Sequence, residues 1–132
     1  MPPSKLARLT LGFIFIYQGL VPKLMFLDKT ELYLNQLHLD LALVPVWFTA
    51  QLMAKLAGIG EILLGLLIII VARKNWPIWL AIVALIVLLL DCVLLAPHLL
   101  TGAFNPLSTN IAMLGLAWIA LQPQPNIIKL KF

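Results

Sequence analysis

Residues 76–96 read WPIWLAIVALIVLLLDCVLLA, and this stretch decides the class of fold. Asp91 is its only charged side chain, and nearly all the others are apolar. A helix needs about 20 mostly apolar residues to cross a bilayer core about 30 Å thick. The stretch therefore predicts a transmembrane helix, and Pro97 ends it because a proline cannot continue a helix.

Three more stretches have the composition of membrane-spanning helices. They are residues 6–24, 48–72 and 106–121, the last of them short. Only residues 73–75 separate the helix at 48–72 from the helix at 76–96, so we expect these two to be antiparallel neighbours. Together the four stretches predict an all-α fold. It is an integral membrane bundle of four transmembrane helices that forms a single domain over residues 1–132.

The composition of the whole chain agrees with a lipid environment. Hydrophobic residues make up 63% of it and charged residues 11%, whereas soluble domains have about 45–50% and about 25%. A soluble protein of this size has too little interior to bury so much apolar surface. The net charge of +4 comes mainly from cations at the ends of the apolar stretches. This distribution indicates membrane topology, and the chain has no basic tract interleaved with aromatic residues that would favour nucleic-acid binding.

Two segments outside the apolar stretches carry helix-start signals. Residues 28–31, DKTE, resemble a capping box, and the residues after them mix polar and apolar side chains. That segment is too polar to span, so we predict a short amphipathic helix on the membrane surface. Asn105 and Pro106 predict the start of the last helix, with Asn105 as its N-cap.

The lysines and arginines are divided unequally between the two ends of the predicted helices. If the N-terminus is cytoplasmic, six lie inside (Lys5, Arg8, Arg73, Lys74, Lys129 and Lys131) and three outside (Lys23, Lys29 and Lys55). The positive-inside rule then predicts that both termini are cytoplasmic.

Ionisable side chains within a membrane span cost about 2.5–3.5 kcal/mol and are functional by default. With a rise of about 1.5 Å per residue from the inner helix ends, Gln18 and Glu61 lie at about 17 Å, and Asp91 and Lys23 at about 21 and 24 Å. Asn110 reaches a similar level from the outer end. These depths predict a polar ligand pocket in the outer half of the bilayer. Its residues are Gln18, Lys23, Glu61, Asp91, His98, Asn105 and Asn110.

Glu61 lies on a stripe of small residues, with Ala57 and Gly65 four residues away on either side and Gly58 beside it. Small residues let helices approach closely in a bilayer, so we expect this stripe to face the bundle interior. We expect Lys23 to pair with a carboxylate, Asp91 first by depth and Glu61 second. In a purely structural alternative these charges only pair, and Gln18 and Asn110 join helices by hydrogen bonds.

The remaining polar residues carry weaker signals. A second alternative to the ligand pocket is a metal site of Glu61, Asp91 and His98. No HxxxH or ExxH spacing supports it, and we predict no metal. Asp91 and His98 share a helix face only if their helix continues past the proline between them. We expect His38 to be solvated on the surface helix. Cys92, the single cysteine, excludes an intrachain disulfide and is expected to be a small buried hydrophobe.

Three motifs resemble the DoxX-like family. They are QGLVPKL at residues 18–24, GIGEILLG at 58–65, and Pro97 followed by FNPLSTN at 104–110. The similarity extends in matching order from about Leu9 to Leu121. The resemblance implies a bacterial inner-membrane protein with four helices. It implies little chemistry, because the thiosulfate:quinone oxidoreductase subunit that gives the family its name does not define the activity of every member.

Three classes of function agree with these observations. The first is a binding or accessory membrane protein whose pocket around Glu61 holds a small ligand, such as a quinone headgroup or a polar lipid. The second is an oxidoreductase subunit acting with the quinone pool, and the third is a small carrier or proton-coupled channel. We prefer the first, because no redox-cofactor ligand set is visible and four short helices leave little room for alternating access. The expected partners are the lipid bilayer, another membrane or redox protein, and a second copy of the chain.

Overall fold

The computed structural model describes residues 1–42 and 44–123, and every regular element in these residues is helical. The α-helices are α1 (Pro3–Gln18), α2 (Lys29–Leu41), α3 (Ala50–Ile70), α4 (Trp76–Leu95) and α5 (Pro106–Leu121). A π-helical segment, η1 (Gly19–Met25), continues α1, and a 3-10 helix, η2 (Pro97–Thr101), follows α4. The all-α prediction is confirmed. Lys129 and Lys131, which enter the predicted orientation, lie outside the described residues.

The helix ends follow the local signals in the sequence. The carboxylate of Asp28 accepts hydrogen bonds from the backbone N–H groups of Thr30 and Glu31, at 2.9 and 3.4 Å, and so caps α2. The side chain of Asn105 caps α5 by accepting from the N–H of Ser108 at 2.9 Å. Both residues are therefore N-caps, as predicted. The reciprocal half of the capping box is not formed, because the N–H of Asp28 donates to the Pro22 carbonyl oxygen at 2.7 Å.

Among residues 1–42 and 44–123, two helices, α3 and α4, are long and apolar enough to cross a membrane, judged by length and composition. The number rises to three if α1 with η1, together with α2, forms one broken span. The fifth helix, α5, is apolar but has 16 residues, which is short for a full crossing. The helical class of the bundle is therefore established, whereas the four-span arrangement stays a prediction.

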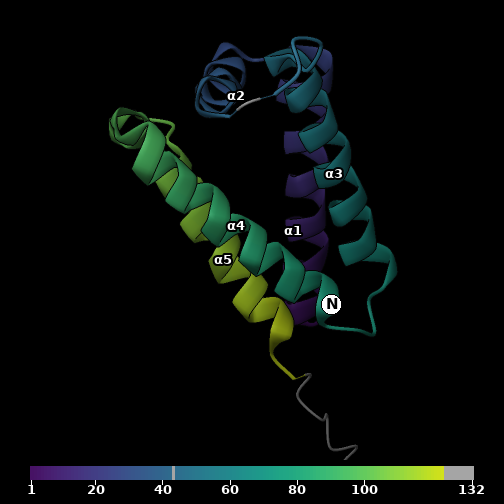
Figure 1. The fold of residues 1–132 in the computed structure, drawn as a ribbon. Helices are drawn as coiled ribbons and strands as arrows, with labels where there is room; N and C mark the ends of the chain where they lie inside the picture. The colour runs from purple at the N-terminus through teal and green to yellow at the C-terminus, as the bar shows by residue number, and fades with distance from the viewer. Residues whose placement is uncertain (43, 124–132) are drawn as a thin grey trace, which may run out of the picture.

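A proline shapes the transition from α1 to α2. Pro22 lies inside η1, where it lacks an N–H donor and its ring crowds the preceding turn, so the backbone widens into a π-helical turn. Leu27 follows with a φ of 47°, a left-handed conformation that a side chain rarely adopts. The chain then bends by 82° into α2. The short helix expected from the sequence is present and runs across the end of the bundle (Figure 1), and its location on the membrane surface stays a prediction.

The helices form two pairs that meet at one end of the molecule (Figure 1). The first pair is α1 with α3, the second is α4 with α5, and α1 also packs against α5. From their short connecting loop, α3 and α4 diverge towards the end that carries α2 (Figure 1). The expectation of antiparallel neighbours thus holds near the loop and fails beyond it, because α3 packs along α1 instead.

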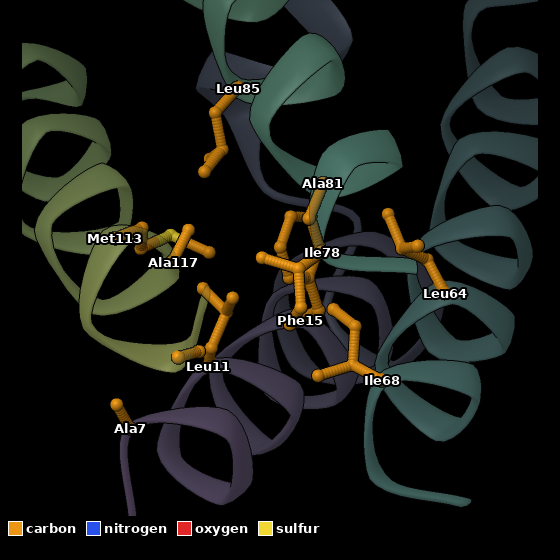
Figure 2. Packing of buried hydrophobic residues seen from close by; sticks show 11 residues of the cluster. Ala7, Leu11, Phe15, Leu64, Ile68, Ile78, Ala81, Leu85, Met113 and Ala117 are labelled. Carbon is orange, nitrogen blue, oxygen red and sulfur yellow. The ribbon is translucent and has the colours of Figure 1, made fainter. Parts of the chain in front are cut away.

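The hydrophobic core lies where the two pairs meet, near the N-terminus (Figure 2). Leu11 and Phe15 of α1 pack there with Ile68 of α3, Ile78 of α4 and Met113 of α5. All five side chains are buried. The core therefore closes this end of the bundle and leaves the opposite end open between the pairs.

Close backbone contacts hold α1 against α3. A Cβ atom at Gly19 would lie 2.3 Å from the carbonyl oxygen of Gly58, and one at Gly65 would lie 2.5 Å from that of Gly12. Real Cβ atoms essentially never come so near another atom, so only glycine permits this spacing. Gly58 and Gly65 face the bundle as expected, but Ala57 is exposed. The buried stripe contains Ala54 instead, because the face of α3 that packs against α1 includes Ala54 and Gly58 and not Ala57.

Candidate functional site

A cavity of about 720 Å³ is lined by the N-terminal part of α2 and by the helix ends that lie near it. We call it the α2 pocket. Its wall contains every residue of the pocket predicted from sequence: Gln18, Lys23, Glu61, Asp91, His98, Asn105 and Asn110. These side chains come from α1, η1, α3, α4, η2 and the start of α5. The structure therefore brings all seven to one cavity, and ligand binding in that cavity stays a prediction.

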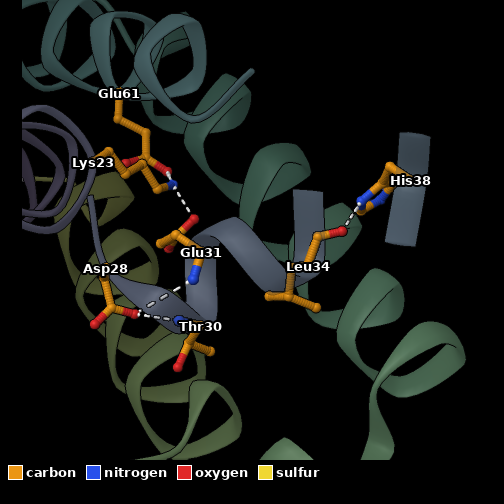
Figure 3. A network of polar contacts seen from close by, with 7 residues as sticks. All are labelled: Lys23, Asp28, Thr30, Glu31, Leu34, His38 and Glu61. Carbon is orange, nitrogen blue, oxygen red and sulfur yellow. Dashed lines mark hydrogen bonds and ion pairs between the residues drawn. The ribbon is translucent and has the colours of Figure 1, made fainter. Parts of the chain in front are cut away.

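Lys23 is the centre of a charge cluster in this wall (Figure 3). Its ammonium group donates a hydrogen bond to Glu61 and lies 3.6 Å from the carboxylate of Glu31. The side chain of Lys23 is 7% exposed and that of Glu61 15%. The expectation that Lys23 pairs first with Asp91 is wrong. Lys23 pairs with Glu61 instead, because α1 and η1 pack against α3 while α4 leans away.

Asp91 pairs with His38, a residue of α2 that we expected to be solvated. His38 Nε2 lies 2.8 Å from Asp91 Oδ1, and His38 Nδ1 lies 2.7 Å from the Leu34 carbonyl oxygen. Both ring nitrogens thus face acceptors, and only the protonated imidazolium donates to both. Burial lowers the pKa of His38, but the hydrogen bonds to Leu34 and Asp91 and the Asp91 charge outweigh it, so the pKa is raised. The expectation of a solvated His38 is wrong.

His98 contacts α2 rather than Asp91. The α-helix stops at Leu95, and η2 turns His98 towards Tyr33, with ring centroids 5.9 Å apart in an edge-to-face arrangement. The condition for Asp91 and His98 to share a helix face is therefore not met. Together with the His38–Asp91 contact, the His98–Tyr33 contact holds α2 across the end of the pocket.

The sequence did not place the N-terminal part of α2 at the site. Asp28, Thr30, Glu31 and Leu34 all line the α2 pocket. Their capping signal was visible, but it indicated a helix on the membrane surface and gave no direction for the helix. The 82° bend, which depends on how η1 packs, is what turns them over the cavity.

Several polar groups in the pocket wall have no partner among the described residues. Glu61 Oε2 is buried without a hydrogen bond, although Oε1 of the same carboxylate bonds Lys23. In the described part of the chain, neither Gln18 nor Asn110 makes a side-chain hydrogen bond, so the interhelical bonds of the structural alternative are not formed there. Asn105 is occupied, since it caps α5 and donates to the Gly102 carbonyl at 2.8 Å. The wall therefore offers unused hydrogen-bonding groups.

The second strongly polar region is a buried arginine at the opposite end. Arg8 is 6% exposed and donates to the carbonyls of Ile68, Val71 and Lys74 at 3.0–3.5 Å. The carbonyls of Ile68 and Val71 are at the C-terminal end of α3, where the helix dipole favours a cation, and that of Lys74 is in the following loop. Arg8, which the sequence indicated only as a topology signal, is thus a structural cap. In residues 1–42 and 44–123, no three His, Cys, Asp or Glu side chains gather as a metal site would require.

The long apolar helices α3 and α4 are typical of an α-helical membrane protein, and a polar cavity lies beneath α2. The model of the DoxX-like family matches residues 12–118, a range that includes all seven pocket residues predicted from sequence. The chain belongs to the DoxX-like family. No curated protein and no solved structure matches it.

Proposed function

We propose that this DoxX-like protein crosses a bacterial inner membrane four times and binds a small ligand in the α2 pocket. The observation that carries the proposal is Glu61, whose buried Oε2 has no donor among the described residues. A buried polar atom without a partner costs free energy, and a ligand that donates a hydrogen bond removes this cost. The cavity volume of about 720 Å³ also falls within the range of about 300–1,000 Å³ of small-molecule sites.

The proposed orientation places both termini in the cytoplasm and the α2 pocket near the outer surface. Among the described residues it is supported by four cations at the end opposite α2 (Lys5, Arg8, Arg73 and Lys74), against three near α2 (Lys23, Lys29 and Lys55). Cysteine labelling in intact cells tests it, with Lys74→Cys and Gly102→Cys made in a Cys92→Ser background. A Cβ at Gly102 meets nothing within 4 Å, so that variant is tolerated. We expect external labelling at 102 only, and external labelling at 74 only would overturn the orientation.

Replacing Glu61 by glutamine tests the binding function. The change keeps the shape of the side chain and removes its charge. The matched control is Asp40→Asn, because Asp40 is an exposed carboxylate of α2 that is not part of the pocket wall. We expect wild type and the control to retain a small molecule through purification, seen by native mass spectrometry, and Glu61→Gln to lose it while remaining folded. A folded Glu61→Gln protein that retains the same molecule would contradict the proposal and favour the structural alternative.

A further inference from the structure

The wall of the α2 pocket is polar at one end and apolar at the other. The polar end is beneath α2, where Glu31 lies beside Lys23 and Glu61, and Asp28 caps the start of α2 (Figure 3). At the end that adjoins the hydrophobic core, the lining is apolar and contains Phe15, Leu85, Leu88 and Met113. A ligand that fills such a cavity has a polar head and an apolar tail.

The pocket has a rim on the apolar outer surface of α4. Leu88 lines the cavity and is also 41% exposed, and its neighbours Val87 and Leu90 are exposed. The helix across from it, α3, contributes Glu61 to the wall and diverges from α4 towards α2 (Figure 1). In a bilayer the exposed face of α4 contacts acyl chains, because it carries only apolar side chains at this level. The apolar end of the pocket therefore adjoins the exposed apolar surface of α4.

The polar end carries an excess of negative charge. Of the five acidic residues in the chain, only Asp40 is absent from the pocket wall. Three of the four carboxylates of the wall have an ion-pair partner: Glu61 and Glu31 share Lys23, and Asp91 pairs with His38, which is charged only when protonated. The carboxylate of Asp28 caps α2 and has no cationic partner among the described residues. The chain as a whole has a charge of +4. The pocket is thus acidic in a basic protein, and the buried Glu61 Oε2 faces no donor of the described chain.

We propose that the α2 pocket binds a membrane amphiphile with a primary ammonium headgroup. The ammonium donates to Glu61 Oε2 and offsets the excess carboxylate charge, and the apolar chain lies along Leu85, Leu88 and Met113. This inference rests on the proposed function, because it specifies the ligand of the same cavity. A headgroup that only accepts hydrogen bonds, such as a carbonyl, gains nothing from Glu61 Oε2. Aminophospholipids and free alkylamines share the ammonium chemistry.

The test compares three probes of equal chain length on the full chain in neutral maltoside micelles. They are dodecylammonium, dodecanol and dodecanoate, and binding is followed by native mass spectrometry and by the shift in unfolding temperature. We expect dodecylammonium to bind at least about tenfold more tightly than the other two. Glu61→Gln should remove this preference, and Asp40→Asn, which deletes one carboxylate outside the pocket, should leave it unchanged. Glu31→Gln, a milder change at a more exposed carboxylate, should weaken it if Glu61→Gln fails to fold.

The outcomes separate the two proposals. If dodecanol or dodecanoate binds as tightly as dodecylammonium and the binding needs Glu61, the ammonium inference is wrong and the pocket remains a binding site. If no probe distinguishes wild type from Glu61→Gln or Glu31→Gln, the ammonium inference is overturned. The binding proposal is overturned only if Glu61→Gln also retains the molecule that co-purifies with wild type. Protein in nanodiscs identifies the source of the headgroup. Retention of phosphatidylethanolamine over phosphatidylglycerol supports a lipid, and retention of neither, with dodecylammonium still bound, supports a free amine.

Discussion

Replacing Gly19 with alanine should push α1 away from α3 at the end of the bundle that carries the pocket. A Cβ atom at Gly19 would lie 2.3 Å from the Gly58 carbonyl oxygen, and ordinary contacts begin at 3.4 Å. The two backbones would therefore have to separate by about 1 Å. The obstructing atom belongs to the backbone of a helix, so no side-chain rotation relieves the clash.

The expected destabilisation follows from the cost of overpacking. Inserting a methyl group into a well-packed contact costs about 1–3 kcal/mol. The matched control is Gly60→Ala on α3, where a Cβ meets nothing within 4 Å. There the alanine stabilises the helix by about 0.8–1.0 kcal/mol. The free energies of unfolding of the two variants should thus differ by about 2–4 kcal/mol.

Reversible unfolding in mixed micelles of maltoside and dodecyl sulfate, followed by circular dichroism, measures this difference. Gly65→Ala repeats the experiment at the second contact, where the Cβ would lie 2.5 Å from the Gly12 carbonyl oxygen. If Gly19→Ala and Gly65→Ala are as stable as Gly60→Ala, α1 and α3 do not approach each other as described and the reasoning is refuted.

Two more predictions concern the charged pairs around the pocket. Lys23→Met should lower the free energy of unfolding by about 3–5 kcal/mol, because it leaves the Glu61 carboxylate buried without its partner. Adding Glu61→Leu should restore most of the lost stability, and a double variant as unstable as the single one would contradict the pairing. His38 has a raised pKa, so its stabilisation of the folded state is complete below its ordinary pKa of 6.5 and is lost as the pH rises through the raised value. Unfolding measured against pH should show this loss in wild type and not in His38→Gln, and parallel profiles would argue against the contact with Asp91.

The features that the sequence predicted depend on local chemistry or on depth alone. Asp28 and Asn105 cap their helices because a capping side chain bonds N–H groups two or three residues away. The seven pocket residues were grouped by counting residues along each helix, and helices of regular rise preserve that count. These two kinds of information need no knowledge of how the helices pack.

The features that the sequence did not predict depend on packing. Lys23 bonds Glu61 and Glu31 rather than Asp91 because the glycine contacts hold η1 against α3, while α4 diverges. His38 reaches Asp91 only because α2 bends by 82° over the cavity. Arg8 gave the same signal as any other cation near a membrane surface, and its role as a cap appears only once α1 lies beside the end of α3.

The separation of core and pocket has a physical reason in the lipid environment. In the most apolar 18-residue stretches of α3 and α4, only 28% and 22% of the residues, respectively, are buried inside the protein. In water such exposure would drive the diverging helices together and close the cavity. In a bilayer the acyl chains solvate the same side chains, so no comparable force closes the gap between α3 and α4. Backbone contact at Gly12 and Gly19, together with the core around Phe15, can then hold one end of the bundle while the acidic pocket at the other end stays open.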